Sequence, residues 1–526
     1  MRHWFFAISA AVFAVIGFAG WLWQPAWLAL LVALPVFFLG IRDLLQTRRA
    51  VLRNFPVIGH FRYLLEMIRP EINQYFIESN TDGKPFSRAM RSVAYQRAKQ
   101  ELETIPFGTQ RDVYEVGYEW MSHSIMAHEA PANPRIRIGE GRARNPYDAS
   151  IYNISAMSFG SLSANAVRAL NGGAKHGAFF HNTGEGGISD HHLASGGDLV
   201  WQIGTGYFGC RHRDGTFNEE MFEENAALPS VRMIEVKLSQ GAKPGHGGIL
   251  PGKKVTKEIA KIRGVTIGQD VLSPPYHSAF ATPRELLEFI DKLRNLSGKP
   301  TGFKLCVGDR AEFLSICKAM LATGIVPDFI AVDGGEGGTG AAPVEFSNSI
   351  GAPLTDGIVI VHNALQGFGL REQVKIIASG KIITGFQIAQ RIAAGADLCN
   401  SARGFMFSLG CIQALRCNSN DCPVGVATQD AGLSKGLVVT QKTQRVANYH
   451  KATVHAFLET LGAAGISHPS SLRPRHINRR VSETQTKNYA EIFHFLNKDD
   501  LLGPEIPESW RGPMSLSSAD SFQPQP

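Results

Sequence analysis

The sequence predicts an α/β protein in which a (β/α)8 barrel, a TIM barrel, follows an N-terminal two-helix transmembrane hairpin and a helical N-terminal extension. Two observations carry this prediction. Two long uncharged stretches open the chain, and from residue 152 onward short β-rich apolar runs alternate with stretches of helical period, as βα units require. With 526 residues, 44% of them hydrophobic, the chain is long enough to bury the core of such a barrel.

The first uncharged stretch runs from Trp4 to Trp23, and the second runs from Ala26 to Gly40. Arg2 precedes the first stretch, several arginines follow the second, and the turn between them carries no charge, so the positive-inside rule places both ends in the cytoplasm. A cleaved signal peptide is the alternative, but no small-x-small cleavage site precedes the second stretch. We therefore expect residues 1–45 to form a membrane hairpin.

Residues 46–150 mix aromatic and charged positions without a clear period, and we expect them to form a helical extension that packs on the barrel. The barrel domain is expected over residues 151–465, and residues 466–526 would form a C-terminal extension. The formal charge of +7 is modest and is spread along the chain without a lysine-rich tract. This pattern does not favour a nucleic-acid partner.

Eight apolar runs over about 250 residues match the size of a (β/α)8 barrel. Helices such as Glu285–Leu296, Ala311–Ala322 and Phe386–Ala394 are expected between several of them. A doubly wound open sheet is the alternative, and the lack of a GxGxxG turn that opens a helix after a strand weakens it. The predicted strands are Asn153–Met157, Ala178–Asn182, Met233–Leu238, Gln269–Leu272, Gly302–Cys306, Phe329–Val332, Val374–Ala378 and Asp397–Ser401.

Three of the seven cysteines, Cys411, Cys417 and Cys422, stand close together in the run GCIQALRCNSNDCPVG. Thiolates at this spacing are typical ligands of soft metals, and a proline after a ligating cysteine is common in iron–sulfur loops. A disulfide framework is the alternative, but the other four cysteines are scattered singly in apolar surroundings. We expect an iron–sulfur centre at residues 411–422, which would allow the chain to handle electrons.

Polar and glycine residues follow the predicted strands, where a barrel carries its chemistry. The first strand leads into residues 155–160, the second into 182–187, the third into 239–245 and the sixth into 333–340. Glycines after the last two strands, with Arg403 beside them, are typical of a phosphate site. One glycine-rich loop can be a simple turn, but several at one rim indicate a binding site.

From about Tyr152 to Gly462 the chain resembles the FMN-binding synthase domain of the glutamate synthase family. The resemblance rests on the runs NISAMSFGSLS, HNTGEGG, EVKLSQGAKPGHGGILPGKKV, DGGEGGTGAAP and CPVGVATQ, which occur in the family's order. It implies a barrel that holds FMN at its strand ends and a 3Fe-4S cluster on the three clustered cysteines. The implied activity is that of an oxidoreductase, the reductive amination of 2-oxoglutarate to glutamate. The form of DGGEGGTGAAP looks closest to the short large-subunit-like proteins of the family.

The resemblance also implies roles for single residues. Lys304 resembles the lysine that stabilises the reduced flavin, and Gln240 and Lys243 match the positions expected to hold the substrate carboxylates. Glu185 would polarise or deprotonate ammonia, or else brace its loop. We count Glu185 and Lys304 as candidate catalytic residues. Beside Lys304, the residues expected to contact FMN are Ala156, Met157, Ser158, Ser379, Gly380, Ala402 and Arg403.

The chain also departs from the large enzymes of this family. Their glutaminase domain uses an N-terminal cysteine, whereas no cysteine precedes Cys210 here, so ammonia is expected from outside the chain. No ferredoxin-type module or nicotinamide fingerprint is evident, so we expect an external electron donor: ferredoxin, a reductase subunit or a membrane donor. His246 stands in PGHGG where the large enzymes usually have an acid.

Two alternative functions remain open at this point. The same steps with methylamine would give an N-substituted glutamate. The chain could instead be a membrane-tethered flavin and iron–sulfur electron carrier without 2-oxoglutarate turnover. Retention of Gln240 and Lys243 favours a carboxylate substrate over a bare carrier. In each case we expect a protein anchored in the membrane by its two N-terminal helices, with the barrel in the cytoplasm.

Overall fold

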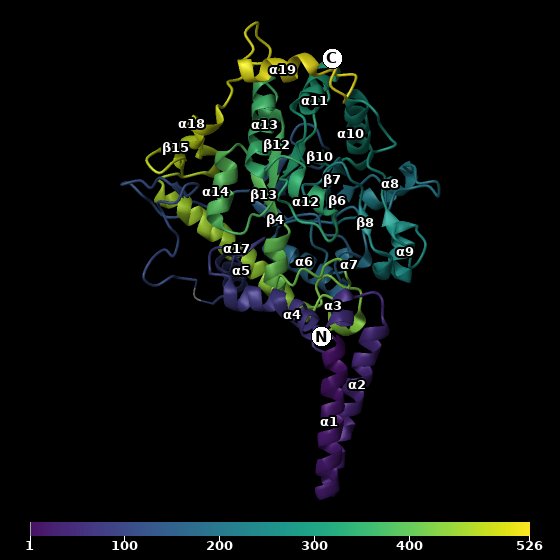
Figure 1. The fold of residues 1–526 in the computed structure, drawn as a ribbon. Helices are drawn as coiled ribbons and strands as arrows, with labels where there is room; N and C mark the ends of the chain where they lie inside the picture. Colours follow the sequence, from purple (N-terminus) through teal and green to yellow (C-terminus); the bar gives the residue numbers. More distant parts are fainter. Residues whose placement is uncertain (1, 102, 526) are drawn as a thin grey trace. The chain divides into compact units, whose positions relative to one another are not determined.

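The structure is a computed structural model that describes residues 2–101 and 103–525 (Figure 1). The chain forms two compact units, Met1–Arg88 and Ala89–Pro526. The first unit holds the two apolar helices, and the second holds the barrel.

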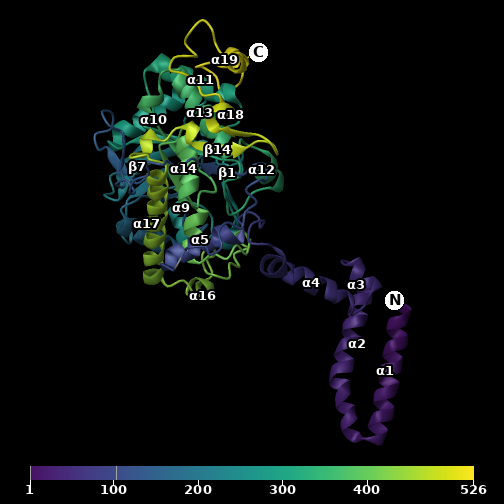
Figure 2. The ribbon, with the colours of Figure 1, turned by 90° about the vertical axis from the view of Figure 1, so that its left-hand side faces the viewer.

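The first unit begins with α1 (Arg2–Leu22) and α2 (Leu30–Leu45), which are joined by the 3-10 turn η1 (Gln24–Ala29). The two helices lie side by side as a hairpin in both ribbon views (Figures 1 and 2). Segments Arg2–Leu22 and Gln24–Leu45 are each long and apolar enough to cross a membrane, with hydropathies of 2.2 and 2.1. A signal sequence at this position would have the same properties. The prediction of two apolar helices is confirmed.

Short helices follow the hairpin: α3 (Ala50–Asn54), α4 (Gly59–Ile72), the π-helical turn η2 (Asn73–Ile77) and α5 (Arg88–Lys99). The predicted extension is thus helical as far as Lys99. Beyond that point it forms the strands β1 (Glu119–Met121), β2 (Ile136–Ile138) and β3 (Tyr147–Ala149). Strands β2 and β3 pair with each other and share one buried apolar cluster with the starts of several barrel strands, so this part of the extension closes one end of the barrel.

Eight parallel strands close into a barrel in the second unit, which confirms the predicted fold class. Closure is made by β13 and β4, where Asn400 lies opposite Asn153 and Ser401 opposite Ile154. Nearly all strand residues are buried, as parallel strands covered by helices require. The barrel strands are β4 (Tyr152–Ile154), β5 (His181–Asn182), β6 (Leu199–Ile203), β7 (Val231–Lys237), β10 (Thr301–Leu305), β11 (Phe329–Asp333), β12 (Lys375–Ser379) and β13 (Leu398–Ser401).

Seven of the eight predicted strands are correct, and one is wrong. Residues 269–272 do not enter the barrel, because β9 (Val271–Leu272) pairs antiparallel with β8 (Ile249–Leu250) outside it. The missing strand is β6, a fully buried five-residue run between two glycine-containing turns. The predicted third strand, Met233–Leu238, is therefore the fourth strand of the barrel, β7, and residues 239–245 follow this fourth strand. A short apolar run that lacks alternation gives little signal for a strand, which explains the error.

Several of the barrel helices begin where the sequence offers a side-chain cap. Thr282 and Glu285 form a capping box at the start of α10, and Thr384 and Gln387 do the same for α14. The predicted helices are confirmed with ends shifted by one or two residues. The main barrel helices are α6 (Ala164–Gly177), α10 (Pro283–Ser297), α11 (Arg310–Thr323), α13 (Leu354–Gly367), α14 (Gly385–Ala393), α15 (Arg403–Leu409) and α17 (Val439–Ala463).

Smaller elements complete the second unit. Strands β14 (Ile477–Arg480) and β15 (Thr486–Asn488) form a three-stranded antiparallel sheet with β1, so the C-terminal extension pairs with the segment that precedes the barrel. The remaining helices are α7 (Asp190–Leu193), α8 (Glu219–Ala226), α9 (Lys257–Arg263), α12 (Val344–Ser349), α16 (Ala431–Ser434), α18 (Tyr489–Phe493) and α19 (Glu508–Leu516), with 3-10 turns η3 (Gly252–Lys254), η4 (Arg371–Gln373), η5 (Pro469–Ser471) and η6 (Pro474–His476).

Gly241 controls how closely the loop after β7 approaches the loop after β11. A Cβ at this position would lie 1.6 Å from the carbonyl oxygen of Gly334. The Gly241 amide also donates to Asp333 Oδ2 at 3.0 Å, so the two loops cannot move apart without losing this bond.

We predict that Gly241→Ala lowers the free energy of unfolding by at least about 1–3 kcal/mol, because the loops must separate to admit the methyl group. Thermal unfolding followed by circular dichroism measures the effect. Gly340→Ala is the matched control, since no heavy atom lies within 4 Å of a Cβ built there. Equal melting temperatures for the two variants would contradict the prediction.

Candidate active site

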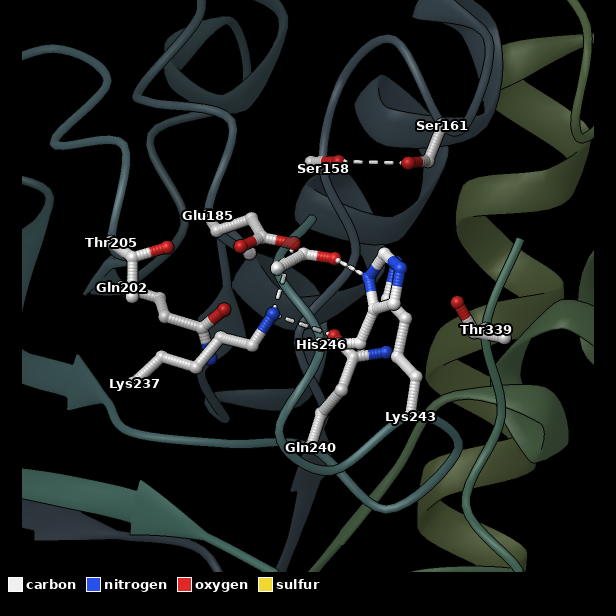
Figure 3. Close-up of polar contacts among 12 residues, drawn as sticks. Ser158, Ser161, Glu185, Gln202, Thr205, Lys237, Gln240, Lys243, His246 and Thr339 are labelled. Atoms are coloured by element: carbon white, nitrogen blue, oxygen red, sulfur yellow. Dashed lines mark hydrogen bonds and ion pairs between the residues drawn. The ribbon is translucent and has the colours of Figure 1, made fainter. Parts of the chain in front are cut away.

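Charged and amide side chains from neighbouring strands gather at the carboxyl ends of the barrel strands (Figure 3). Lys237 is the last residue of β7, and it lies opposite Lys304 of β10 in the strand register. Glu185 follows β5, and Asp333 ends β11. All four side chains are largely buried. The barrel thus brings together residues that are about 150 positions apart in the sequence.

Lys237 lies at the centre of this group. Its Nζ is 2.9 Å from Glu185 Oε1 and donates a hydrogen bond to Gln240 Oε1 at 2.6 Å (Figure 3). Burial alone would raise the pKa of Glu185, but the charge and hydrogen bond of Lys237 together with the charges of Lys243 and Arg263 outweigh burial and hold this pKa below its ordinary value. Glu185 is therefore a carboxylate at neutral pH.

The space around Glu185 depends on glycine. A Cβ on Gly204 or on Gly248 would lie 2.7 Å from an atom of the Glu185 side chain. Both positions adjoin strands of this region: Gly204 directly follows β6, and Gly248 directly precedes β8. Any larger residue at either position would displace the carboxylate from Lys237.

A second ion pair lies beside the first. Lys304 Nζ is 3.1 Å from Asp333 Oδ2. Desolvation would lower the pKa of Lys304, but Asp333 and Glu235 outweigh it and raise this pKa above its usual value. Burial raises the pKa of Glu235, whose Oε1 accepts hydrogen bonds from the amides of Asn182 and Gln202. Lys304 is thus a buried charged lysine rather than a surface residue.

Lys243, predicted to bind substrate, is buried and belongs to the same group. Its Nζ donates to the carbonyl oxygen of Ala341 at 3.2 Å, which joins the QGAKPG loop to the DGGEGGTGAAP loop. Desolvation, partly offset by the charge of Glu185, lowers the pKa of Lys243 to about 8. A negatively charged ligand beside Lys243 would therefore favour its protonated form.

The residues expected to contact FMN lie along two sides of the rim. The hydroxyls of Ser155 and Ser379 are 3.1 Å apart and join the loop after β4 to the end of β12. Gly380 follows with a φ of +146°. Asn400 lies opposite Ser379 in the register, and its buried Oδ1 has no hydrogen-bond partner among the residues that the structure describes. Such an atom fits a site for a polar ligand.

Arg403 begins α15, directly after Ala402, and its Nη2 donates to the carbonyl oxygen of Glu336 at 2.7 Å. Burial lowers the pKa of Arg403 to about 10, and the nearby Asp333 and Glu336 oppose this shift. Arg403 thus carries a positive charge beside the glycine-rich loop after β11. A Cβ on Gly338 would lie 2.8 Å from the guanidinium, so this loop must be glycine to pass so close.

Ala156, Met157 and Ser158 form the loop after β4, and Met157 is buried. The Ser158 hydroxyl donates to that of Ser161 at 3.1 Å (Figure 3). The Ser161 carbonyl in turn accepts a hydrogen bond from Lys254 Nζ at 3.0 Å, and the same ammonium donates to the Ala427 carbonyl at 2.9 Å. This lysine therefore joins the loop after β4 to the segment that follows the clustered cysteines.

The three clustered cysteines are free thiols. Cys422 is buried, and Cys411 and Cys417 are half-buried. Burial, reinforced by the other two thiols, raises the pKa of Cys411 to about 12, and burial together with Cys422 raises that of Cys417. The thiols are thus close enough to affect one another's pKa electrostatically. Across residues 2–101 and 103–525, no three His, Cys, Asp or Glu side chains are grouped to hold a single metal ion.

Sequence reasoning missed two charged residues of this site, Lys237 and Arg263. Arg263 ends α9 in the excursion between β8 and β9, and its Nη2 donates to the Phe159 carbonyl at 3.2 Å. Burial lowers the pKa of Arg263 to about 10, with Glu185 opposing the shift. A lysine at the end of a buried strand was the available signal for Lys237, as it was for Lys304. No local signal distinguishes Arg263, because its partners are distant in sequence.

The fold and the site define a (β/α)8-barrel protein with a charged strand-end site of the kind found in enzymes. Residues 103–467 match the model of the conserved region in glutamate synthase. The chain therefore belongs to the glutamate synthase family. The large-subunit-like protein YerD of Bacillus subtilis is 37% identical to it over 88% of this chain and 97% of its own length.

Other relatives match a smaller share of the chain. The archaeal glutamate synthase [NADPH] of Methanocaldococcus jannaschii is 36% identical over 61% of this chain, and the chain spans only 60% of that protein's length. Among solved structures, a flavocytochrome b2 variant covers 89% of this chain at 11% identity with a TM-score of 0.42, a likeness too distant to bear on function.

We predict that Lys237→Met destabilises the protein by about 3–5 kcal/mol, because Glu185 then lies buried without its main partner. The pKa of Glu185 should rise for the same reason. Glu185→Gln introduced into the Lys237→Met protein should recover part of the loss, since the unpaired charge is gone. A double-mutant cycle of thermal unfolding measures both effects. If the two single changes are simply additive, the ion pair does not contribute as described.

Proposed function

We propose that this protein is an FMN- and iron–sulfur-dependent oxidoreductase of glutamate synthase type, which aminates 2-oxoglutarate reductively to glutamate. The observation that carries the proposal is the group formed by Lys237, Gln240, Lys243 and Glu185 at the strand ends of a barrel that belongs to this family. Ammonia would come from outside the chain.

Two carboxylates must be held if 2-oxoglutarate is the substrate, and the site offers donors for both. Lys243 would supply a charge-assisted hydrogen bond to one of them. The Oε1 of Gln240 accepts from Lys237, which leaves its amide NH2 group to donate to a ligand. The second cation, Lys237, is already paired with Glu185 and would orient that carboxylate rather than bind substrate directly.

Glu185 would act on the nitrogen source. Because its pKa lies below the ordinary value, Glu185 is ionised at neutral pH and would hold an ammonium ion and polarise its N–H bonds by charge. Lys237 fixes the orientation of this carboxylate from one side, and the glycine backbones at Gly204 and Gly248 confine it from the others. The amine would thus be presented to the keto carbon from a fixed direction.

FMN would lie along the rim between the loop after β4 and the glycine-rich segments after β11 and β12. Ala156, Met157 and Ser158 would contact its ring, and Ser379, Gly380, Ala402 and Arg403 its phosphate. Bound FMN would supply the hydride that the reductive step needs. Lys304 would hold a positive charge near the ring, and the ion pair with Asp333 keeps that charge in place.

The three clustered cysteines would hold a 3Fe-4S cluster that supplies single electrons. The thiols must lose their protons to bind iron. Burial raises their pKa and so opposes this loss, and the positive charge of bound iron would compensate for that opposition. Lys254, whose pKa is lowered by burial and raised by the charges of Cys417 and Cys422, would then offset part of the negative charge of the thiolates.

The apolar hairpin would anchor the protein in a membrane with both ends in the cytoplasm. Arg2 Nε donates to the Arg53 carbonyl and Arg2 Nη2 to Asn54 Oδ1, so the start of α1 and the segment after α2 lie at one end of the hairpin. This arrangement supports the proposed topology. Electrons would come from an external donor, either ferredoxin, a reductase subunit or a membrane donor.

The decisive experiment uses the purified full-length protein, reduced artificially without oxygen and mixed with 2-oxoglutarate and either ammonia or methylamine. Reoxidation of the flavin with formation of glutamate supports the proposal. Turnover with methylamine alone would instead identify an N-substituted glutamate synthase. Protein that keeps its flavin reduced in both mixtures would be an electron carrier.

We predict that Lys243→Ala raises the apparent 2-oxoglutarate constant by roughly ten- to a hundredfold and leaves the flavin spectrum unchanged, because it removes one charge-assisted contact. Lys243 is charged below its pKa, so kcat/KM for 2-oxoglutarate should fall as the pH rises through about 8, and this fall should be absent in the variant. Lys253→Ala, at an exposed lysine of the β8–β9 excursion, is the control. An unaltered pH profile in Lys243→Ala would contradict the assignment.

We predict that Cys417→Ser lowers the iron content of anaerobically purified protein and leaves about one FMN per chain, because the thiolate is lost while the barrel rim is intact. Iron and flavin analysis of the same sample gives both quantities. Asp421→Asn, an exposed change in the same loop, should keep both. Wild-type protein that is yellow but free of iron would exclude the cluster.

A further inference from the structure

Helix α4 carries an apolar stripe that the other described residues of the first unit leave exposed. Phe61, Leu64, Leu65 and Ile68 follow one another at helical spacing on one face. Their exposed fractions are 67%, 46%, 56% and 37%. Four large apolar side chains at this exposure on one short helix are unusual for a surface in contact with water alone, and they indicate an interaction site.

The position of α4 is fixed relative to the end of the apolar hairpin. Asp43, in the last turn of α2, accepts a hydrogen bond from the backbone amide of Val57 at 2.9 Å. The same carboxylate contacts Nε2 of His60, in the first turn of α4, at 2.9 Å. The helix therefore begins at the level where the second apolar helix ends.

Both ribbon views show α4 lying across the direction of the hairpin rather than along it (Figures 1 and 2). If the hairpin crosses a membrane, a helix that starts at its end and runs across it lies in the plane of the membrane surface. An apolar stripe on such a helix can face the acyl chains without breaking any backbone hydrogen bond.

Charge around the helix is positive. Between residues 41 and 77 the chain has six arginines and three acidic residues. Arg62 and Arg69 lie next to the apolar stripe on the helix surface, and Arg69 has only a long 3.7 Å contact with the exposed Glu66. Arginines at the edge of an apolar stripe reach phosphate groups while their stems cover apolar surface.

We infer that α4 is an interfacial helix that binds anionic phospholipid, with its apolar stripe in the acyl region and Arg62 and Arg69 on the lipid phosphates. The inference rests on the proposed membrane hairpin and adds a second attachment that recognises lipid charge. It would hold the segment after the hairpin flat against the membrane, so that the chain leaves the membrane parallel to its surface.

The test is hydroxyl-radical footprinting of the full-length protein in nanodiscs of phosphatidylcholine, with or without phosphatidylglycerol. Met67 lies outside the stripe, on the flank of the helix away from Arg62 and Arg69. Its exposed fraction of 61% is close to the 67% of Phe61, so Met67 is an internal reference. We expect Phe61 to be oxidised roughly tenfold more slowly in nanodiscs that contain phosphatidylglycerol than in nanodiscs of phosphatidylcholine alone, and Met67 to be oxidised at the same rate in both. Arg62→Gln with Arg69→Gln should remove the difference between the two lipids.

Two variants separate lipid contact from a general effect on the helix. Leu65→Glu should restore the oxidation of Phe61 in anionic nanodiscs, whereas Met67→Glu should not. The inference is overturned if, in anionic nanodiscs, Phe61 of the wild-type protein is oxidised as fast as Phe61 of the Leu65→Glu protein. It is also overturned if Phe61 is equally protected in both kinds of nanodisc, as expected for a stripe covered by protein. Phe18 and Phe38 of the hairpin report separately: their oxidation in both nanodiscs would overturn the membrane hairpin itself.

Discussion

The strand register places two lysines side by side in the interior of the barrel rim, and the rest of the site depends on how their charges are balanced. Lys237 and Lys304 are paired positions on adjacent parallel strands. Two buried ammonium groups so close together are stable only if carboxylates lie beside them. Glu185 and Asp333 fill this role, and Glu235 adds a third carboxylate within electrostatic range of Lys304. The loops after β5 and β11 are therefore held in place by charge.

The same balance explains the glycines around the site. A loop that must deliver a carboxylate to a buried lysine has to pass close to other backbone, and Gly204, Gly241 and Gly248 stand at such points of close approach. Gly241 brings the loop after β7 against Gly334, next to Asp333. Glycine at these three positions therefore has a steric reason that is separate from phosphate binding. A phosphate site also needs a positive charge, and Arg403 supplies one beside the glycine-rich loop after β11.

The fold could be predicted from the sequence because seven strands lead into polar or glycine residues, and several of them are followed by helices with side-chain caps. Strand β6 could not, because LVWQI is short and, apart from Gln202, apolar without alternation, a pattern that a buried helix segment shares. Four residues of the candidate site were predicted because they lie in or match the family's motifs: Glu185, Gln240, Lys243 and Lys304. The partners that set the charge state of these residues, Lys237 and Arg263, become visible only when the barrel closes, since each contacts groups from other strands.

The cysteine loop and the strand-end site are connected by a short series of polar contacts. Ser158 bonds Ser161, the Ser161 carbonyl accepts from Lys254, and Lys254 is close enough to Cys417 and Cys422 for their charges to affect its pKa. On the other side, the Tyr95 hydroxyl donates to the Cys411 carbonyl at 2.6 Å, so α5 of the predicted extension also holds this loop. A change in charge at the thiols would therefore reach Lys254 directly and, through it, the loop after β4. The cysteine loop and the rim are therefore linked by hydrogen bonds and charge within the second unit, although residues more than 150 positions apart in the sequence supply these contacts.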